Sequence, residues 1–280
     1  MATGQDDRIY PLTRIVAAIV VPFLVLAFII LYFFPELSGS RFAWSIQPNM
    51  TAMFMGAGYI GGSWLFANAV FGRRWHRVAP GYPPVTAFTI AMLLATALHW
   101  DRFDPGHLPF ILWLGLYVIT PFLVPLVWLY NRRADSGAPE ADDALTPVAA
   151  RWGLRLLGLA ILVFAVVGFL QPEWLISVWA WKLSPLTARI MSGWFVLLGV
   201  GGLVIGRETR WSSWRVGLQS IGLWQLLVVI AALVNPADFS GGLFNWYLVS
   251  VIVVLVGMAG LYVVMELQRR HRRAAGTVAG

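Results

Sequence analysis

Residues 15–34 read IVAAIVVPFLVLAFIILYFF, twenty consecutive residues without a charged side chain. As an α-helix, a run of this length crosses a hydrocarbon core about 30 Å thick. Its end lacks the small residues of a signal-peptidase site, so we expect a permanent first span and no cleaved leader. This stretch places the chain among the membrane proteins.

Seven further apolar runs of similar length follow along the 280 residues. Because backbone groups in lipid must be hydrogen-bonded internally, these runs are expected to form helices. The alternating polarity that a β-barrel requires in segments of about ten residues does not occur. The eight predicted spans cover residues 15–34, 50–71, 85–99, 109–130, 153–170, 186–205, 216–234 and 246–267.

The composition excludes several other classes of protein. The chain is 59% hydrophobic and only 12% charged, whereas soluble domains are about 25% charged. A soluble enzyme, a disordered tail and a nucleic-acid binder are therefore excluded despite the net charge of +7. The chain has no cysteine, and Lys182 is its only lysine. An arginine bias of this kind is typical of GC-rich genomes, so we expect a bacterial inner membrane.

The basic residues predict the orientation. If the N-terminus is cytoplasmic, sixteen of the twenty lysines and arginines fall in cytoplasmic segments. This asymmetry follows the positive-inside rule and predicts that both termini are cytoplasmic. Eleven of the fifteen tryptophans lie at predicted helix ends, where we expect their indole rings at the level of the lipid headgroups. The four basic residues predicted to lie outside are Arg41, Arg102, Lys182 and Arg189.

Two stretches of the sequence resemble each other. Residues 35–55 read PELSGSRFAWSIQPNMTAMFM, and residues 172–191 read PEWLISVWAWKLSPLTARIM. The offset between matching positions is 137 and falls to 136 after one deletion, and Arg74-Trp75 matches Arg210-Trp211 farther along. The repeated positions are Pro35, Glu36, Trp44, Pro48 and Thr51 in the first copy and Pro172, Glu173, Trp181, Pro185 and Thr187 in the second.

The matches predict an all-α protein made by duplication. Each half holds four spans, an even number, so the halves enter the membrane in the same direction and a pseudo-twofold axis runs along the membrane normal. We expect a first repeat over residues 1–130, a mobile cytoplasmic linker without chemistry over 131–150, and a second repeat with a basic tail over 151–280. Residues 173–181 are expected to form a short interfacial helix.

The second and sixth predicted spans are rich in small residues. Gly58 and Gly62 form one GxxxG step, and Gly202 and Gly206 form another. Such steps allow two helices to approach closely, so these two spans are predicted to form the interface between the halves. A glycine-lined path is the alternative interpretation of the same residues.

Ionisable residues are absent from the middle of every predicted span. A transporter that couples to protons through a carboxylate at the membrane midplane is therefore not expected. Gln225 lies near the middle of the seventh span, Gln219 two turns nearer the cytoplasm, and Asn68 toward the inner end of the second span. Such amides either bond neighbouring helices or contact a ligand.

The loop between the third and fourth spans concentrates polar side chains. Imidazole and carboxylate groups could bind a divalent ion or serve as acid and base, or they could simply face water. Their spacing matches no metal signature, and we assign no metal, cofactor or catalytic residue. The candidate outward-facing binding residues are His99, Asp101, Arg102, Asp104 and His107.

Three functions remain open at this point. The first is binding or transport of a small or amphiphilic molecule between the two repeats. The second is a membrane-embedded enzyme that acts on a lipid-linked substrate at the outer His/Asp/Arg loop. The third is a non-catalytic subunit of a larger membrane complex. The expected partners are the lipid bilayer, a small-molecule or lipid ligand and another membrane protein, and no nucleic acid.

Overall fold

A computed structural model of the chain describes residues 6–278, so both ends of the predicted repeats extend beyond the described part. Between residues 6 and 278 the chain forms helices and no β-strand. Seven helices are long and apolar enough to cross a membrane, and the chain is a multi-pass helical membrane protein. They are α1 (Pro11–Phe28, continued by the π-helical turn Ile29–Phe33), α4 (Tyr82–Leu98), α5 (Leu108–Asn131), α6 (Val148–Leu170), α8 (Pro185–Ile205), α9 (Trp211–Val234) and α10 (Leu243–Val278).

The second predicted span forms helix α3 (Asn49–Phe71), which is not one of these seven. It carries no charged residue, but its glycines, Ser63 and Asn68 make it less apolar than the others. Fifteen of its 23 residues are buried, against five of the eighteen in α1. A helix that other helices surround does not need a strongly apolar surface, because little of that surface meets lipid.

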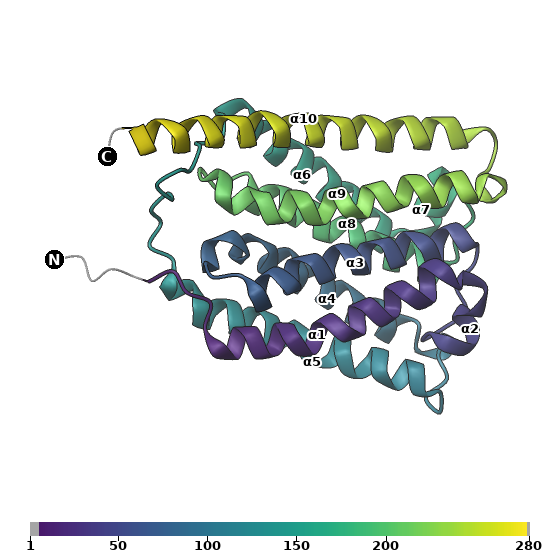
Figure 1. Cartoon of the computed structure of the whole chain (residues 1–280). Helices are drawn as coiled ribbons and strands as arrows, with labels where there is room; N and C mark the ends of the chain where they lie inside the picture. The colour runs from purple at the N-terminus through teal and green to yellow at the C-terminus, as the bar shows by residue number, and fades with distance from the viewer. Residues whose placement is uncertain (1–5, 279–280) are drawn as a thin grey trace.

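The long helices form one bundle (Figure 1). Helix α3 packs between α1 and α9, and α8 packs between α6 and α4. Helix α5 lies on α4, and α10 lies on α9. The helices before and after residues 131–150 are therefore not separate bodies, because α3 packs on α9 and α8 packs on α4.

The sequence predicts that α3 and α8 form the interface between the halves, but neither helix packs mainly on the other. Helices α3 and α8 both lie at the boundary, but each packs mainly on another helix. The step at Gly202 and Gly206 faces α6 of its own half: a Cβ on Gly202 would lie 2.8 Å from Gly158 Cα. Gly58 does face the other half, where a Cβ would come within 2.5 Å of the Trp194 ring.

The two ends of the bundle differ in character. Both ends of the described chain lie at one end, here called the basic end, while α2 (Ser38–Arg41) and α7 (Pro172–Val178) lie at the opposite end (Figure 1). Helix α7 confirms the short helix predicted over residues 173–181, although it stops three residues earlier. The 3₁₀ turn η2 (Pro35–Leu37) precedes α2 in the matching place. Repeated prolines begin these segments, since Pro35 and Pro172 each occupy a first helical position, where a missing N–H costs nothing.

The tryptophans at the helix ends correct another prediction. Several of them are covered by packed side chains and are therefore not exposed to lipid headgroups. Trp44 contacts Trp113 with ring centroids 5.0 Å apart, and Trp181 contacts Trp179 at the same distance. The loops between helices fold over these rings, which sequence position alone does not reveal. The buried tryptophans among those predicted at the headgroup level are Trp44, Trp75, Trp181, Trp211 and Trp214.

The segment predicted as a mobile linker is fixed to the bundle by charged contacts. Both oxygens of Asp135 accept hydrogen bonds from Arg210, at 2.7 and 2.9 Å. Both oxygens of Glu140 accept hydrogen bonds from Arg77, each at 2.6 Å. The hydrogen bonds of Arg210 hold the pKa of Asp135 below its usual value, although burial acts in the opposite direction. Residues 131–150 thus brace the basic end.

Candidate functional site

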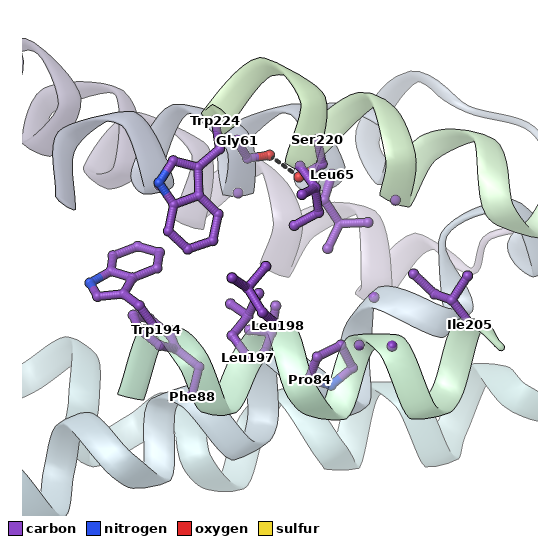
Figure 2. A pocket seen from close by; sticks show the side chains of 18 of the residues that line it. Gly61, Leu65, Pro84, Phe88, Trp194, Leu197, Leu198, Ile205, Ser220 and Trp224 are labelled. Atoms are coloured by element: carbon purple, nitrogen blue, oxygen red, sulfur yellow. Dashed lines mark hydrogen bonds between the residues drawn. The ribbon is translucent and has the colours of Figure 1, made fainter. Parts of the chain in front are cut away.

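A cavity of about 240 Å³ lies inside the bundle, between the layer of α3 and α9 and the layer of α4 and α8. In Figure 2, Ser220 and Trp224 face it from one layer and Trp194, Leu197 and Leu198 from the other. None of the described residues that line it is acidic, basic or a histidine. The cavity is thus apolar and can hold an uncharged group without stripping water from an unpaired ion.

Several of the glycines that line the cavity lie in close contact with bulky side chains or with backbone. Gly58 lies under the Trp194 ring, and a Cβ on Gly81 would come within 2.5 Å of Leu65. A Cβ on Gly61 would lie 2.8 Å from the carbonyl oxygen of Ser220. The absent side chains therefore let the helices approach closely and leave the larger residues to define the walls.

The two halves contribute to the cavity at corresponding positions. On α3 and α8, and again on α4 and α9, lining residues 136 positions apart occur in pairs, and a small residue in one half often corresponds to a large residue in the other. Farther out, α1 and α6 contribute lining residues 137 positions apart. The pairs include Gly58 and Trp194, Gly61 and Leu197, Leu65 and Gly201, Phe66 and Gly202, Gly81 and Gly217, Phe88 and Trp224, Thr89 and Gln225, and Val20 and Leu157.

Aromatic rings close the cavity toward the end that carries α2 and α7. The Trp194 ring has its centroid 4.4 Å from that of Phe88 and 5.1 Å from those of Tyr59 and Trp224. Trp224 is fixed in turn, because its Nε1 donates to the carbonyl oxygen of Phe54 at 3.2 Å. From this aromatic group the cavity extends toward Ile205 at the basic end (Figure 2).

A few uncharged polar groups reach the lining. The hydroxyl oxygens of Tyr59 and Tyr117 lie 3.1 Å apart in a buried pair. Only one of the two hydroxyl hydrogens can lie between the oxygens, so the other finds no acceptor among the described residues. The Gln225 side chain, which the sequence placed at mid-membrane, also forms no hydrogen bond there. Unpaired polar groups in an apolar setting are costly, and both could be satisfied by a polar ligand atom.

The cavity is closed on one side and reaches the lipid-facing surface on the other. At the side of α1 and α5 the lining residues Val20 and Val124 are only 7% and 2% exposed. At the side of α6 and α10 the lining residues Leu157 and Val254 are 49% and 44% exposed. Helix α10 packs mainly on α9 and less on α6.

The five candidate residues of the outer loop have separate contacts and do not converge on one site. His99 Nε2 accepts a hydrogen bond from Arg189 at 2.6 Å, while Asp101 and Arg102 form an exposed ion pair at 3.2 Å. Burial and then the Arg189 charge lower the pKa of His99, which favours its neutral form. Asp104 caps the backbone N–H of Gly106 at 2.8 Å.

The fifth candidate, His107, contacts the protein backbone, since its Nε2 lies 3.1 Å from the carbonyl oxygen of Phe42. Within residues 6–278 no three His, Asp or Glu side chains are placed so as to hold a metal ion. The structure does not bring these five residues together in one site, and the outer binding site remains a prediction.

Residues of the repeated motif form contacts at the end of the bundle that carries α2 and α7. Trp181 Nε1 donates to Thr51 Oγ1 at 2.8 Å, a buried hydrogen bond that joins the two copies. Thr187, the match of Thr51, instead forms a capping box with Ser184 at the start of α8. Trp44, the match of Trp181, has no partner for its indole N–H among the described residues.

A polar cluster at the basic end was not predicted. Asp7 accepts the backbone N–H of His76 at 3.0 Å, and its other oxygen lies 2.5 Å from His76 Nδ1. Asp143 binds Ser212 in the same way, with the backbone N–H at 2.9 Å and the hydroxyl at 2.5 Å. The two pairs meet where His76 Nε2 lies 2.9 Å from Ser212 Oγ. The signal in the sequence was the shared offset of 136 between Asp7 and Asp143 and between His76 and Ser212.

The Asp7, His76 and Ser212 side chains resemble a hydrolytic triad in their order but not in their chemistry. Burial lowers the pKa of His76, but the hydrogen bonds of Asp7 and Glu140 outweigh it and the net shift is upward. In a hydrolytic triad the serine hydroxyl donates to the imidazole, whereas here the Ser212 hydroxyl donates to Asp143 at 2.5 Å. Ser212 is also fully buried, and the cluster links four segments of the chain that lie far apart in sequence.

Comparisons with known proteins give no second line of evidence on the function, because no protein-family model, no curated protein and no solved structure matches this chain.

Proposed function

We propose that the chain is an eight-span inner-membrane protein made of two parallel four-helix repeats, and that it binds the apolar part of a small uncharged amphiphile in the cavity between them. The paired lining at an offset of 136 supports the repeats. So do the helix contacts, because α1–α3 matches α6–α8, α3–α9 matches α8–α4, and α4–α5 matches α9–α10. Helix α3 is the eighth span in this proposal, since it runs between α1 and α9.

The proposed orientation places the basic end in the cytoplasm. Arg74, Arg77, Arg210 and Arg269 all lie in the charged contacts of that end, which is where the positive-inside rule expects them. The cavity then lies in the cytoplasmic half of the bilayer, because its lining runs from the aromatic group to Ile205.

The observation that carries the proposed ligand class is the uncharged lining with unpaired polar groups. An apolar cavity of about 150 Å³ accepts a benzene-sized ligand, and sites for drug-sized molecules measure about 300–1,000 Å³. The present cavity, at about 240 Å³, suits one ring or a stretch of one hydrocarbon chain rather than a whole phospholipid. The Tyr59–Tyr117 pair and Gln225 suit a hydroxyl or carbonyl group on that ligand.

The exposed residues at one side of the cavity support entry from the bilayer. Leu157 of α6 and Val254 of α10 flank the open side, so a lipid-soluble molecule could enter without crossing water. Passage toward the opposite end of the bundle would require the rings of Phe88, Trp194 and Trp224 to separate. Because these rings close one end of the cavity, binding is the function that the geometry supports best. Transport would need the rings to move apart.

The test uses 1-hexadecanol that carries a photoreactive diazirine on its chain, with the purified full-length protein in lipid nanodiscs. We expect the label to map by mass spectrometry to lining residues of α8 and α9. Ile221→Trp, which fills the cavity, should lower this labelling at least fivefold. Leu226→Trp is the matched control, because Leu226 lies on the same helix, is half exposed and does not line the cavity.

Two further comparisons make the outcome decisive. Unlabelled 1-hexadecanol should compete for the site, whereas palmitate of similar length should not, because its carboxylate would be buried without a counter-ion. Labelling confined to exposed residues of α10, or reduced equally by Ile221→Trp and Leu226→Trp, would refute the proposed function.

A further inference from the structure

A second cavity, of about 260 Å³, lies at the basic end between the last turns of α3 and the first turns of α9. Three arginines line it, Arg74 and Arg77 from the loop after α3 and Arg215 from α9. Asn68, Gln219 and Trp64 complete its polar wall. The residues of the first cavity lie on other faces of α3 and α9, and the two linings share no residue.

Hydrogen-bond donors outnumber acceptors in this second cavity. No described residue that lines it is acidic. Arg77 uses its Nε and one Nη on Glu140, and Arg215 places its Nε 2.5 Å from Glu266. The other Nη of Arg77 forms no hydrogen bond within the described part of the chain. Arg215 forms an ion pair with Glu266 through Nε, but none of its guanidinium nitrogens forms a hydrogen bond there.

Arg74 is the least engaged of the three arginines. Its nearest carboxylate oxygens, on Asp7 and Glu140, lie 3.7 and 3.9 Å away, and it forms no hydrogen bond to any described residue. Its side chain is 52% exposed. The acids of this region bind the arginines from outside the cavity and leave unused N–H groups available to it.

Three guanidinium groups around one space are suited to an anion with several oxygens. The planar fork of arginine pairs two N–H groups with two oxygens, which fits phosphate as well as carboxylate. Water occupies about 30 Å³ in the liquid, so the cavity has room for a phosphate group together with the first atoms of its ester. In the proposed orientation the depth also fits, because the ends of α3 and α9 that carry these arginines would lie at the headgroup region.

We propose that this cavity, lined by Arg74, Arg77 and Arg215, binds the phosphate group of a phosphate ester. The ester is either an anionic phospholipid of the adjoining leaflet or a soluble phosphate ester from the aqueous phase. This site does not depend on the central cavity, so each proposal can fail without the other.

The test measures binding to the purified full-length protein by native mass spectrometry. Delipidated protein in detergent receives phosphatidylglycerol, phosphatidylcholine or glycerol 3-phosphate in separate titrations. Arg74→Gln removes one arginine without leaving a hydrogen-bonded partner unpaired. Arg73→Gln is the matched control, because Arg73 is the neighbouring exposed arginine and does not line the cavity.

We expect Arg74→Gln to weaken binding of the phosphate ester at least about fivefold, since one arginine near a membrane surface contributes about 1 kcal/mol. Arg73→Gln should leave it within twofold. Asn68→Phe provides a second variant, which fills the cavity at unchanged charge and should also weaken binding. Thermal unfolding of each variant separates lost binding from lost folding.

The titrations distinguish the two sources of the ester. Variant-dependent binding of phosphatidylglycerol and not of glycerol 3-phosphate assigns the site to a lipid headgroup, and the reverse assigns it to a soluble ester. Equal binding of phosphatidylglycerol and phosphatidylcholine without variant-dependent binding of glycerol 3-phosphate, equal losses in Arg73→Gln and Arg74→Gln, or no binding at all would each overturn the proposal. Ile221→Trp, which tests the central cavity, should leave this binding unchanged.

Discussion

Two adjacent glycines of α8 should respond in opposite ways to the same substitution. A Cβ added to Gly201 would lie 3.8 Å from Pro84 Cβ, an ordinary contact. A Cβ added to Gly202 would lie 2.8 Å from Gly158 Cα and 3.0 Å from the carbonyl oxygen of Leu154. Both of the latter are backbone atoms of α6, so the clash can be relieved only if the two helices separate.

The magnitude follows from two contributions. Replacing glycine by alanine inside a helix stabilises it by about 0.8–1.0 kcal/mol, and this gain is common to both positions. Overpacking a close contact costs about 1–3 kcal/mol, and only Gly202 incurs it. Gly201→Ala should therefore raise the free energy of unfolding by up to about 1 kcal/mol. The free energy of unfolding of Gly202→Ala should be lower than that of Gly201→Ala by about 1–3 kcal/mol.

The assay is equilibrium unfolding in mixed micelles of dodecyl maltoside and increasing SDS, followed by circular dichroism. The difference between the two variants is the informative quantity, because the helix-propensity gain cancels from it. Equal stability of Gly201→Ala and Gly202→Ala, or a more stable Gly202→Ala, would show that α6 and α8 do not approach as closely as the structure places them.

Two further predictions concern the ends of the bundle. The upward-shifted pKa of His76 means that its protonated form stabilises the fold below about pH 6.5 and that this contribution is lost as pH rises through the folded-state pKa. The unfolding temperature of the wild type should therefore fall from about pH 6 to about pH 9 more steeply than that of His76→Gln, and parallel curves would contradict it. Trp181→Phe removes the donor to Thr51 and should cost about 1–3 kcal/mol in the SDS assay. Trp44→Phe should cost less, because the Trp44 indole N–H has no partner among the described residues; equal losses would contradict the assigned bond.

The helices could be predicted from the sequence because lipid permits so few alternatives. An uncharged run such as residues 15–34 must form a helix where no water can satisfy its backbone. The ends were less certain, since polar residues can continue a helix beyond the lipid. Helix α9 begins at Trp211 and not at residue 216, and α10 continues to Val278 and not to residue 267.

The partners of these helices could not be read from the sequence. The GxxxG step at Gly202 and Gly206 predicts that another helix approaches closely, but it does not show which helix that is. The same step was expected to face the other half and faces α6 instead. The prediction for the tryptophans was wrong for a related reason, because only the folded loops determine whether a ring such as that of Trp181 contacts lipid or is covered.

The candidate site could be predicted in part. Gln225 was singled out as a polar residue at mid-membrane, and it does line the central cavity. The cavity itself depends on which residues face each other across helices, as Gly58 and Trp194 do, and no local pattern encodes that register. The polar cluster was missed because its members, Asp7, His76, Asp143 and Ser212, lie far apart in the chain and outside every span predicted from the sequence.

The contact between Gly58 and Trp194 makes the two proposed repeats inseparable. Where the halves meet, one supplies a ring and the other the hollow that receives it. Two copies of the first half would set glycine against glycine and leave a gap, while two copies of the second would force two indole rings into one place. An ancestral chain of half the length, pairing with itself, would have needed one residue of intermediate size here. The present halves, produced as separate chains, should therefore assemble with each other and not with themselves.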